Sequence, residues 1–198
     1  MYHVFEVRRV MKNWFYNNLM AAAERRNISF DIIQYGMKTL GLFVTECSIA
    51  LLFSELLSVL PEATAFVCIF TFLRGYCGGY HCKTYFSCML AYVIMVVFSV
   101  LISKALNYQA VIVLLIVCSI FLFVISPVEN ENNTLEKKYF GIYKKKAQIR
   151  IIICIIIITV LAFDMTADIW KASSMGIVAL SSLCFIQLIR RNLNDWFF

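Results

Sequence analysis

Residues 84–126 read TYFSCMLAYVIMVVFSVLISKALNYQAVIVLLIVCSIFLFVIS, and this stretch decides the fold. It contains two long apolar runs, and Lys104 is its only charged residue. A helix that crosses a bilayer needs about 20 predominantly apolar residues. The stretch therefore predicts two consecutive transmembrane helices, at 84–103 and 109–126, joined by a short turn.

The same pattern recurs along most of the chain. Hydrophobic residues make up 62% of the 198 residues and charged residues 15%, whereas an ordinary soluble domain has about 25% charged residues. A soluble protein of this size could bury one or two such helices in its core, but not all of them. We therefore predict an all-α, polytopic integral membrane protein with further spans at 37–59, 149–167 and 174–190.

Two other segments allow more than one interpretation. The apolar run from Glu62 to Leu73 is too short alone, and it becomes long enough only as a tilted helix extended through Tyr76. We count it as a sixth crossing, with a re-entrant segment as the alternative. Residues 1–35 carry apolar side chains at helical spacing between basic ones. They predict an amphipathic helix in the membrane interface, with a short soluble helix as the alternative.

The distribution of basic residues tests the count of six crossings. Six crossings place both termini and the 74–83 and 127–148 loops on the same side of the membrane. All of the 18 Lys and Arg residues except Lys104 and Lys171 then fall on that side. The positive-inside rule assigns that side to the cytoplasm. Five crossings would separate the N-terminal basic cluster from the later ones. Topology thus accounts for the net charge of +6, and we expect no nucleic-acid partner.

No internal repeat or long linker divides the chain. We therefore expect a single membrane-embedded domain over residues 1–198, composed of the interfacial region at 1–35 and a transmembrane bundle at 37–190. A homodimer is compatible with a small membrane enzyme that handles an amphipathic substrate, although no motif specifies one.

Chemically reactive side chains concentrate in residues 74–88, which read RGYCGGYHCKTYFSC. Glycine costs about 1 kcal/mol in a helix interior, so Gly78 and Gly79 predict a loop or a broken helix. Imidazole can accept the proton of a thiol, and the resulting thiolate can attack a carbonyl to give an acyl thioester. The stretch is therefore a candidate nucleophilic site at the membrane boundary.

Spacing alone does not choose the nucleophile. Cys77 stands four residues before His81, Cys82 is adjacent to it, and Cys88 stands seven residues after it. On a straight helix, positions seven apart are separated by about 10.5 Å along the axis, whereas a hydrogen bond needs about 3 Å. A pair of His81 and Cys88 therefore requires the backbone near His81 to leave helical geometry. By local geometry alone, Cys77 is the rival.

Two other interpretations of the stretch stay open. His81 can be an ordinary loop histidine, with the cysteines acting as small interfacial hydrophobes. Alternatively, His81 and the three cysteines supply four zinc-type ligands, although their spacing matches no standard zinc pattern. We expect no metal and no cofactor.

The run from Arg74 to His81, followed by Cys88, resembles the signature of AgrB, the accessory gene regulator membrane endopeptidase of Gram-positive bacteria. That signature has an Arg, a Gly-Gly pair, a His shortly after, and a Cys seven residues past the His. The segment 126–128, Ser-Pro-Val, which opens a polar and basic loop, is also similar to the family. Cysteine at positions 77 and 82, where the family commonly has alanine, is a departure.

The resemblance implies a membrane cysteine endopeptidase with Cys88 as the nucleophile and His81 as the general base. Its substrate would be a small AgrD-like precursor of a cyclic autoinducing peptide. Such an enzyme cuts the precursor, holds the N-terminal part as an acyl-enzyme, and passes it to a substrate cysteine to close a thiolactone. The chief alternative is a small transporter or peptide exporter without protease activity. Its polar path would use the intramembrane carboxylates Glu46, Glu55 and Asp164.

Other residues are candidate supporting groups. Arg74 could bind a substrate carboxylate, steady the developing oxyanion, or only anchor the chain at the interface. The amides of Gly78 and Gly79 could form an oxyanion hole. Glu46 could orient His81.

The lysines of the 127–148 loop are candidate substrate-binding groups. They could attract an acidic precursor tail, or they could serve topology and bind anionic lipid headgroups. They are Lys137, Lys138, Lys144, Lys145 and Lys146.

Overall fold

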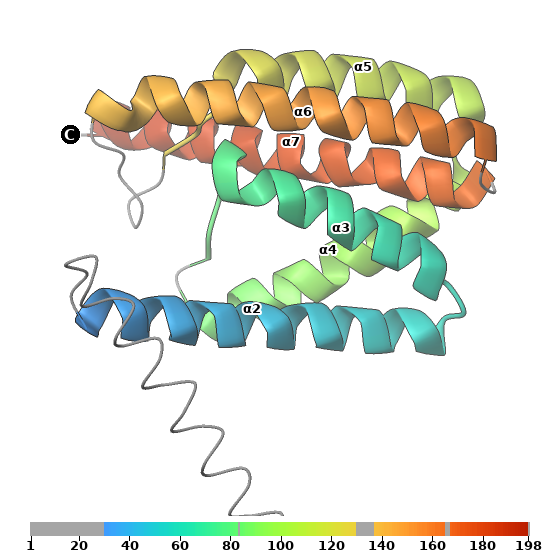
Figure 1. The fold of residues 1–198 in the computed structure, drawn as a ribbon, viewed down its shortest axis with the longest axis horizontal. Coiled ribbons are helices and arrows are strands. Elements are labelled where there is room, and N and C mark those ends of the chain that lie inside the picture. Colours follow the sequence, from blue (N-terminus) through green and yellow to red (C-terminus); the bar gives the residue numbers. More distant parts are fainter. Residues whose placement is uncertain (1–29, 83, 130–136, 165–166, 198) are drawn as a thin grey trace, which may run out of the picture. The chain divides into compact units, whose positions relative to one another are not determined.

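The computed structural model describes residues 30–82, 84–129, 137–164 and 167–197. These residues form six α-helices (Figure 1): α2 Phe30–Leu56, α3 Leu60–Cys77, α4 Tyr85–Ala105, α5 Tyr108–Ile125, α6 Lys137–Asp164 and α7 Ala167–Phe197. The predicted all-α fold is confirmed. Most of the interfacial helix expected over residues 1–35 lies outside the described residues.

Five of these helices are long and apolar enough to cross a membrane. They supply the segments Gly36–Leu56, Tyr85–Ala105, Tyr108–Ile125, Lys138–Phe163 and Ala167–Asn192. The five stronger predicted spans thus correspond to helices. The last two helices are longer than predicted, because lysine and arginine are good helix formers and continue a helix beyond its apolar part. The basic residues expected in the 127–148 loop therefore lie on the first turns of α6.

α3 corresponds to the weakest predicted span. It is an 18-residue helix, about 27 Å long at 1.5 Å per residue, and it is not among the five apolar segments. Glu62 in its first turn and Arg74 in its last turn lower its hydropathy. Its apolar side chains, including Phe66 and Leu73, are buried. α3 is therefore covered largely by other helices, which allows it to carry charged groups at both ends.

Contacts between residues divide the chain into two compact units, 1–45 and 46–198, with the boundary inside α2. In the larger unit, α7 packs against α3, α4, α5 and α6, and Figure 1 shows α3, α6 and α7 running side by side. Gly176 of α7 permits one of these close approaches, because a Cβ there would lie 3.1 Å from the carbonyl oxygen of Phe66. α7 is the helix around which this unit is built.

Cationic side chains lie at two ends of the larger unit. At the end where α3 begins, Lys104 Nζ lies 2.8 Å from Glu62 Oε1, and Lys171 Nζ donates to the carbonyl of Leu106 at 2.8 Å. At the end where α3 finishes, Arg150 Nη1 donates to the carbonyl of Phe72 at 2.8 Å. The two lysines that the charge pattern sets apart thus lie away from the loop between α3 and α4.

Candidate active site

The helical backbone breaks after α3, at residues 78–82, and α4 begins at Tyr85. Gly78 and Gly79 have backbone φ angles of 75° and 114°. Residues other than glycine rarely adopt such positive φ values. Helical geometry resumes after Thr84, whose hydroxyl accepts from the amide of Ser87 at 3.3 Å and caps α4. The backbone at His81 is therefore not helical, which is the condition that a pair of His81 and Cys88 requires.

The segment after α5 holds this loop in place. Gly78 pairs with Val128 in a parallel bridge. The amide of Val128 donates to the carbonyl of Cys77 at 2.8 Å, and the amide of Gly79 donates to the carbonyl of Val128 at 3.3 Å. On the other side, the amide of Tyr80 donates to the carbonyl of Leu183 in α7 at 3.2 Å. The similarity of the 126–128 segment to the family was the one signal in the sequence for this contact.

Both glycines are enclosed by neighbouring atoms. A Cβ on Gly78 would lie 2.1 Å from the carbonyl oxygen of Val128, and a Cβ on Gly79 would lie 2.6 Å from Nη1 of Arg74. Their amides also have acceptors already, since that of Gly78 donates to the carbonyl of Arg74 at 3.2 Å and that of Gly79 to Val128. The oxyanion hole expected from these two amides would require both hydrogen bonds to open.

The guanidinium of Arg74 is turned toward the loop. Nη1 donates to the carbonyl of Gly78 at 2.8 Å, and Nη2 donates to the carbonyl of Tyr80. The group also lies 6.0 Å from the centre of the Phe70 ring. Arg74 therefore binds backbone carbonyls of the loop, a role that the sequence did not indicate.

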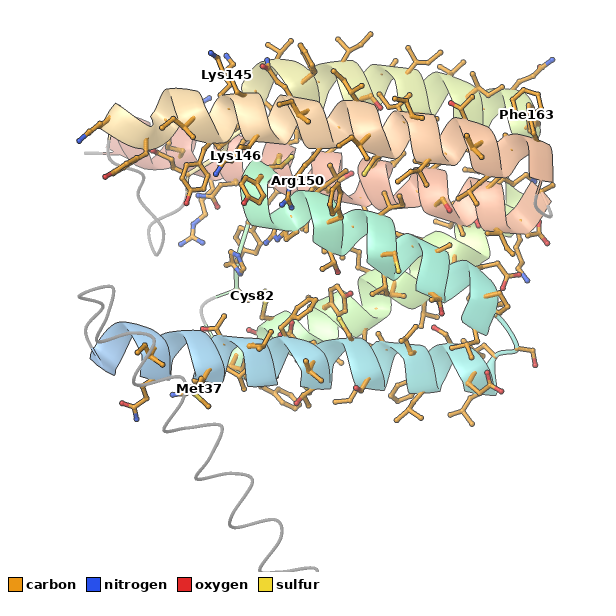
Figure 2. All side chains as sticks on the ribbon, in the orientation of Figure 1. Met37, Cys82, Lys145, Lys146, Arg150 and Phe163 are labelled. Atoms are coloured by element: carbon orange, nitrogen blue, oxygen red, sulfur yellow. The ribbon has the colours of Figure 1, made fainter. Side chains whose placement is uncertain are left out.

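Accessibility separates the cysteines near the loop. Cys77, the rival nucleophile, is 0% exposed, with the thiol of Cys184 donating to its carbonyl at 3.9 Å. Cys88 is partly exposed on the first turn of α4, where its amide donates to the carbonyl of Thr84 at 3.1 Å. Cys82, which Figure 2 shows on the loop between the helices, is also partly exposed. A substrate can reach Cys88 or Cys82 without unfolding the loop, but it cannot reach Cys77.

The imidazole of His81 is uncharged at neutral pH and is therefore free to accept a proton, although its lowered pKa makes it a weaker base than usual. Its side chain lies in the loop with an exposed surface. Partial removal from water and the nearby positive charge of Arg74 lower the pKa of His81 from 6.5 to about 4. Both causes act in the same direction, so the imidazole is neutral at pH 7.

Basic and aromatic side chains surround the end of α3. The guanidinium of Arg150 lies 3.8 Å from the centre of the Tyr76 ring, and Nζ of Lys146 lies 5.9 Å from it. Figure 2 shows Lys146 and Arg150 extending from α6 toward the end of α3, whereas Lys145 extends away from it. Sequence reasoning treated Arg150 as a topology signal only, although it lies one turn after Lys146 on the same helix face.

The remaining candidates are placed as follows. Glu46 lies in the larger unit, within electrostatic range of Arg74 and Cys88. Its expected influence on His81 stays a prediction. Among the described residues, no three His, Cys, Asp or Glu side chains come together as a metal site. The zinc alternative therefore finds no support in the arrangement of the loop cysteines.

These features define an all-helical membrane protein with a thiol and an imidazole at a break between two helices. The chain matches the family model of AgrB, accessory gene regulator B, over residues 9–189, and it belongs to that family. No curated protein and no solved structure matches it. Membership gives the chain a role in autoinducer peptide processing, with an AgrD-type precursor as substrate.

Replacing Gly78 by alanine should disrupt the loop, because the added Cβ would overlap the carbonyl of Val128. We expect precursor processing to fall by about 10²-fold, the cost of a displacement of about 1 Å at a reacting centre. Gly75→Ala is the matched control, since a Cβ at this position in α3 meets nothing within 4 Å. Processing by each variant, measured with purified protein in detergent, checks this. Wild-type processing by Gly78→Ala would show that the bridge to Val128 does not matter.

Proposed function

We propose that this protein is a membrane cysteine endopeptidase that cleaves an AgrD-type precursor through an acyl-thioester intermediate. Cys88 is the nucleophile and His81 the general base. The observation that supports this most directly is the break in the helix before Cys88. It leaves Cys88 partly accessible on the first turn of α4, whereas Cys77 is completely buried.

The proposed reaction proceeds in two transfers. The neutral imidazole of His81 takes the proton of the Cys88 thiol, and the sulfur attacks the scissile carbonyl of the precursor. The C–N bond breaks, the imidazolium gives its proton to the departing amine, and the N-terminal part stays on Cys88 as a thioester. A cysteine thiol of the substrate then attacks this thioester. The thiolactone closes as the bond to Cys88 breaks, and the sulfur of Cys88 receives the proton that the substrate thiol gave up.

Two positive charges near Cys88 act against the cost of forming a negatively charged sulfur that is partly removed from water. The N-terminus of a helix carries a partial positive charge of about half an elementary charge, and its effect is confined to the first turn. Cys88 belongs to the first turn of α4. Arg74 adds a full positive charge within electrostatic range of the same sulfur. The second transfer needs little driving force, since it exchanges one thioester for another.

We further propose that the loop and both termini face the cytoplasm. Basic residues of the larger unit support this orientation, because Lys146 and Arg150 lie where α3 ends, whereas Lys104 and Lys171 lie at the opposite end. The basic first turns of α6 then face the compartment in which an acidic precursor tail would be bound. Of these residues, Lys146 and Arg150 lie against the ring of Tyr76 in the last turn of α3.

The assignment of the nucleophile can be tested by co-expression with the precursor. We expect Cys88→Ser and His81→Ala to insert normally and leave the precursor uncut, because each removes one partner of the proton transfer. Cys77→Ser should still cut, since Cys77 is buried away from substrate. Immunoblots of the tagged precursor and of the membrane fraction report both properties. Full processing by Cys88→Ser would eliminate the mechanism.

The pH dependence of cleavage should reflect the lowered pKa of His81. Since this pKa is about 4 rather than 6.5, the imidazole stays a base as the pH falls from 7 to 5, and cleavage should decline only as the pH approaches 4. Initial rates in detergent, where the enzyme experiences one uniform pH, measure the decline. Activity recovered on return to pH 7 excludes unfolding as its cause. A half-point at or above 6.5 would contradict the assignment of His81.

Charge reversal of the five lysines at the start of α6 tests the proposed binding of an acidic tail. Replacing Lys137, Lys138, Lys144, Lys145 and Lys146 by Glu should weaken precursor binding by at least tenfold without changing topology. The reason is the loss of favourable charge pairs, whose contribution falls with salt. Affinity for a fluorescent precursor at low and high salt, with cysteine accessibility as the topology control, provides the measurement. Unchanged affinity would discard this role.

A further inference from the structure

Arg74 forms a two-pronged contact with the loop that carries His81. Its guanidinium donates from Nη1 to the carbonyl of Gly78 at 2.8 Å and from Nη2 to the carbonyl of Tyr80. These carbonyls flank Gly79. An arginine side chain presents its donors in a rigid planar fork, so two acceptors at fixed spacing hold it in one orientation.

The surrounding atoms leave the guanidinium little freedom. A Cβ on Gly79 would lie 2.6 Å from Nη1, so a side chain at this position would displace the guanidinium from the loop. Arg74 itself belongs to the last turn of α3, one helical turn before the loop begins. The guanidinium thus connects the last turn of α3, which carries it, to the loop carbonyls that it binds.

We propose that Arg74 is a positioning residue, which clamps the carbonyls of Gly78 and Tyr80 and thereby sets where His81 stands relative to Cys88. This inference rests on the proposed function of His81 and Cys88. It replaces the roles that the sequence allowed for Arg74, namely binding a substrate carboxylate or oxyanion and anchoring the chain at the interface.

The planarity of the peptide bond transmits the clamp to His81. The carbonyl oxygen of Tyr80 lies in the same rigid plane as the amide and the Cα of His81. Fixing that oxygen therefore restrains the Cα from which the imidazole extends. The amide of Tyr80 is held as well, by the carbonyl of Leu183 at 3.2 Å. Together the two contacts restrain the residue before His81 at both of its peptide groups.

A substrate-binding arginine and a clamping arginine predict different kinetics. If Arg74 bound the acidic tail of the precursor, its loss would raise KM, and a precursor with a neutral tail would be insensitive to the change. If it clamps the loop, its loss misplaces the base, and the effect falls on kcat irrespective of the tail. Replacing Arg74 by lysine tests whether the planar guanidinium is needed. Lysine keeps the positive charge, but its flexible side chain cannot hold two carbonyls in a fixed arrangement.

The kinetic test compares the full-length variants Arg74→Gln and Arg74→Lys with Arg191→Gln, an exposed arginine of α7 outside the site. Each is assayed in detergent with an acidic precursor and with one whose tail carboxylates are replaced by amides. We expect both Arg74 variants to lose about 10²-fold in kcat with KM within twofold of wild type, equally for both precursors. Arg191→Gln should behave as wild type.

A second measurement uses no substrate. Trypsin releases residues 84–104, whose single cysteine is Cys88, so mass spectrometry can follow its alkylation by iodoacetamide as a function of pH. In Arg74→Gln, we expect the pH profile of this alkylation to shift toward that of His81→Ala, because the thiol has lost its base. Arg191→Gln should keep the wild-type profile.

The outcomes separate the clamp from its alternatives. A wild-type alkylation profile in Arg74→Gln, combined with a raised KM that the neutral tail abolishes, would overturn the clamp in favour of substrate binding. Wild-type kcat in Arg74→Lys would overturn it in favour of charge alone. If Arg74→Gln does not yield monodisperse protein, Arg74→Lys supports both measurements. Cleavage by Cys88→Ser would instead refute the proposed function, independently of any result at position 74.

Discussion

The site depends on a stretch of non-helical backbone between two helices of a membrane protein. Peptide groups that leave a helix lose their regular partners, and those that are buried must find others within the protein. Here the amide of Val128 donates to the carbonyl of Cys77, and the amide of Tyr80 donates to the carbonyl of Leu183. The guanidinium of Arg74 donates to the carbonyls of Gly78 and Tyr80. An uninterrupted helix would instead hold positions 81 and 88 two turns apart.

The helix bundle provides these substitute partners because α7 lies at its centre. α7 contacts each of the helices from α3 to α6, and its small or hydroxyl-bearing residues let the neighbours approach closely. Its carbonyl at Leu183 and the thiol of Cys184 both face the loop. α3 is shielded by these neighbours, which explains how a helix with charged residues at both ends packs among helices that have longer apolar segments. The break is therefore a property of the whole larger unit and not of two glycines alone.

Much of this could be predicted from sequence, because it depends on local composition. Apolar length predicts the helices, and the Gly78-Gly79 pair predicts the break, since both effects act within a few residues. The helix limits were wrong where lysines continue α6, because hydropathy identifies the apolar part of a helix and not its ends. The contact of Val128 with Gly78 spans fifty residues, and no local pattern encodes it. For the same reason, the carbonyl partners of Arg74 and the burial of Cys77 required the fold.

A fixed cation beside the imidazole also bears on the second half of the proposed reaction. Arg74 disfavours a positive charge on His81, so the imidazolium formed when Cys88 loses its proton is a stronger acid than usual. The same charge favours the anionic sulfur and so reduces the cost of forming the pair, which comes mainly from the partial removal of Cys88 from water. The proton is then readily passed to the departing amine, a poor leaving group unless it is protonated. A single guanidinium can thus hold the loop in place and favour proton transfer in the direction that completes peptide cleavage.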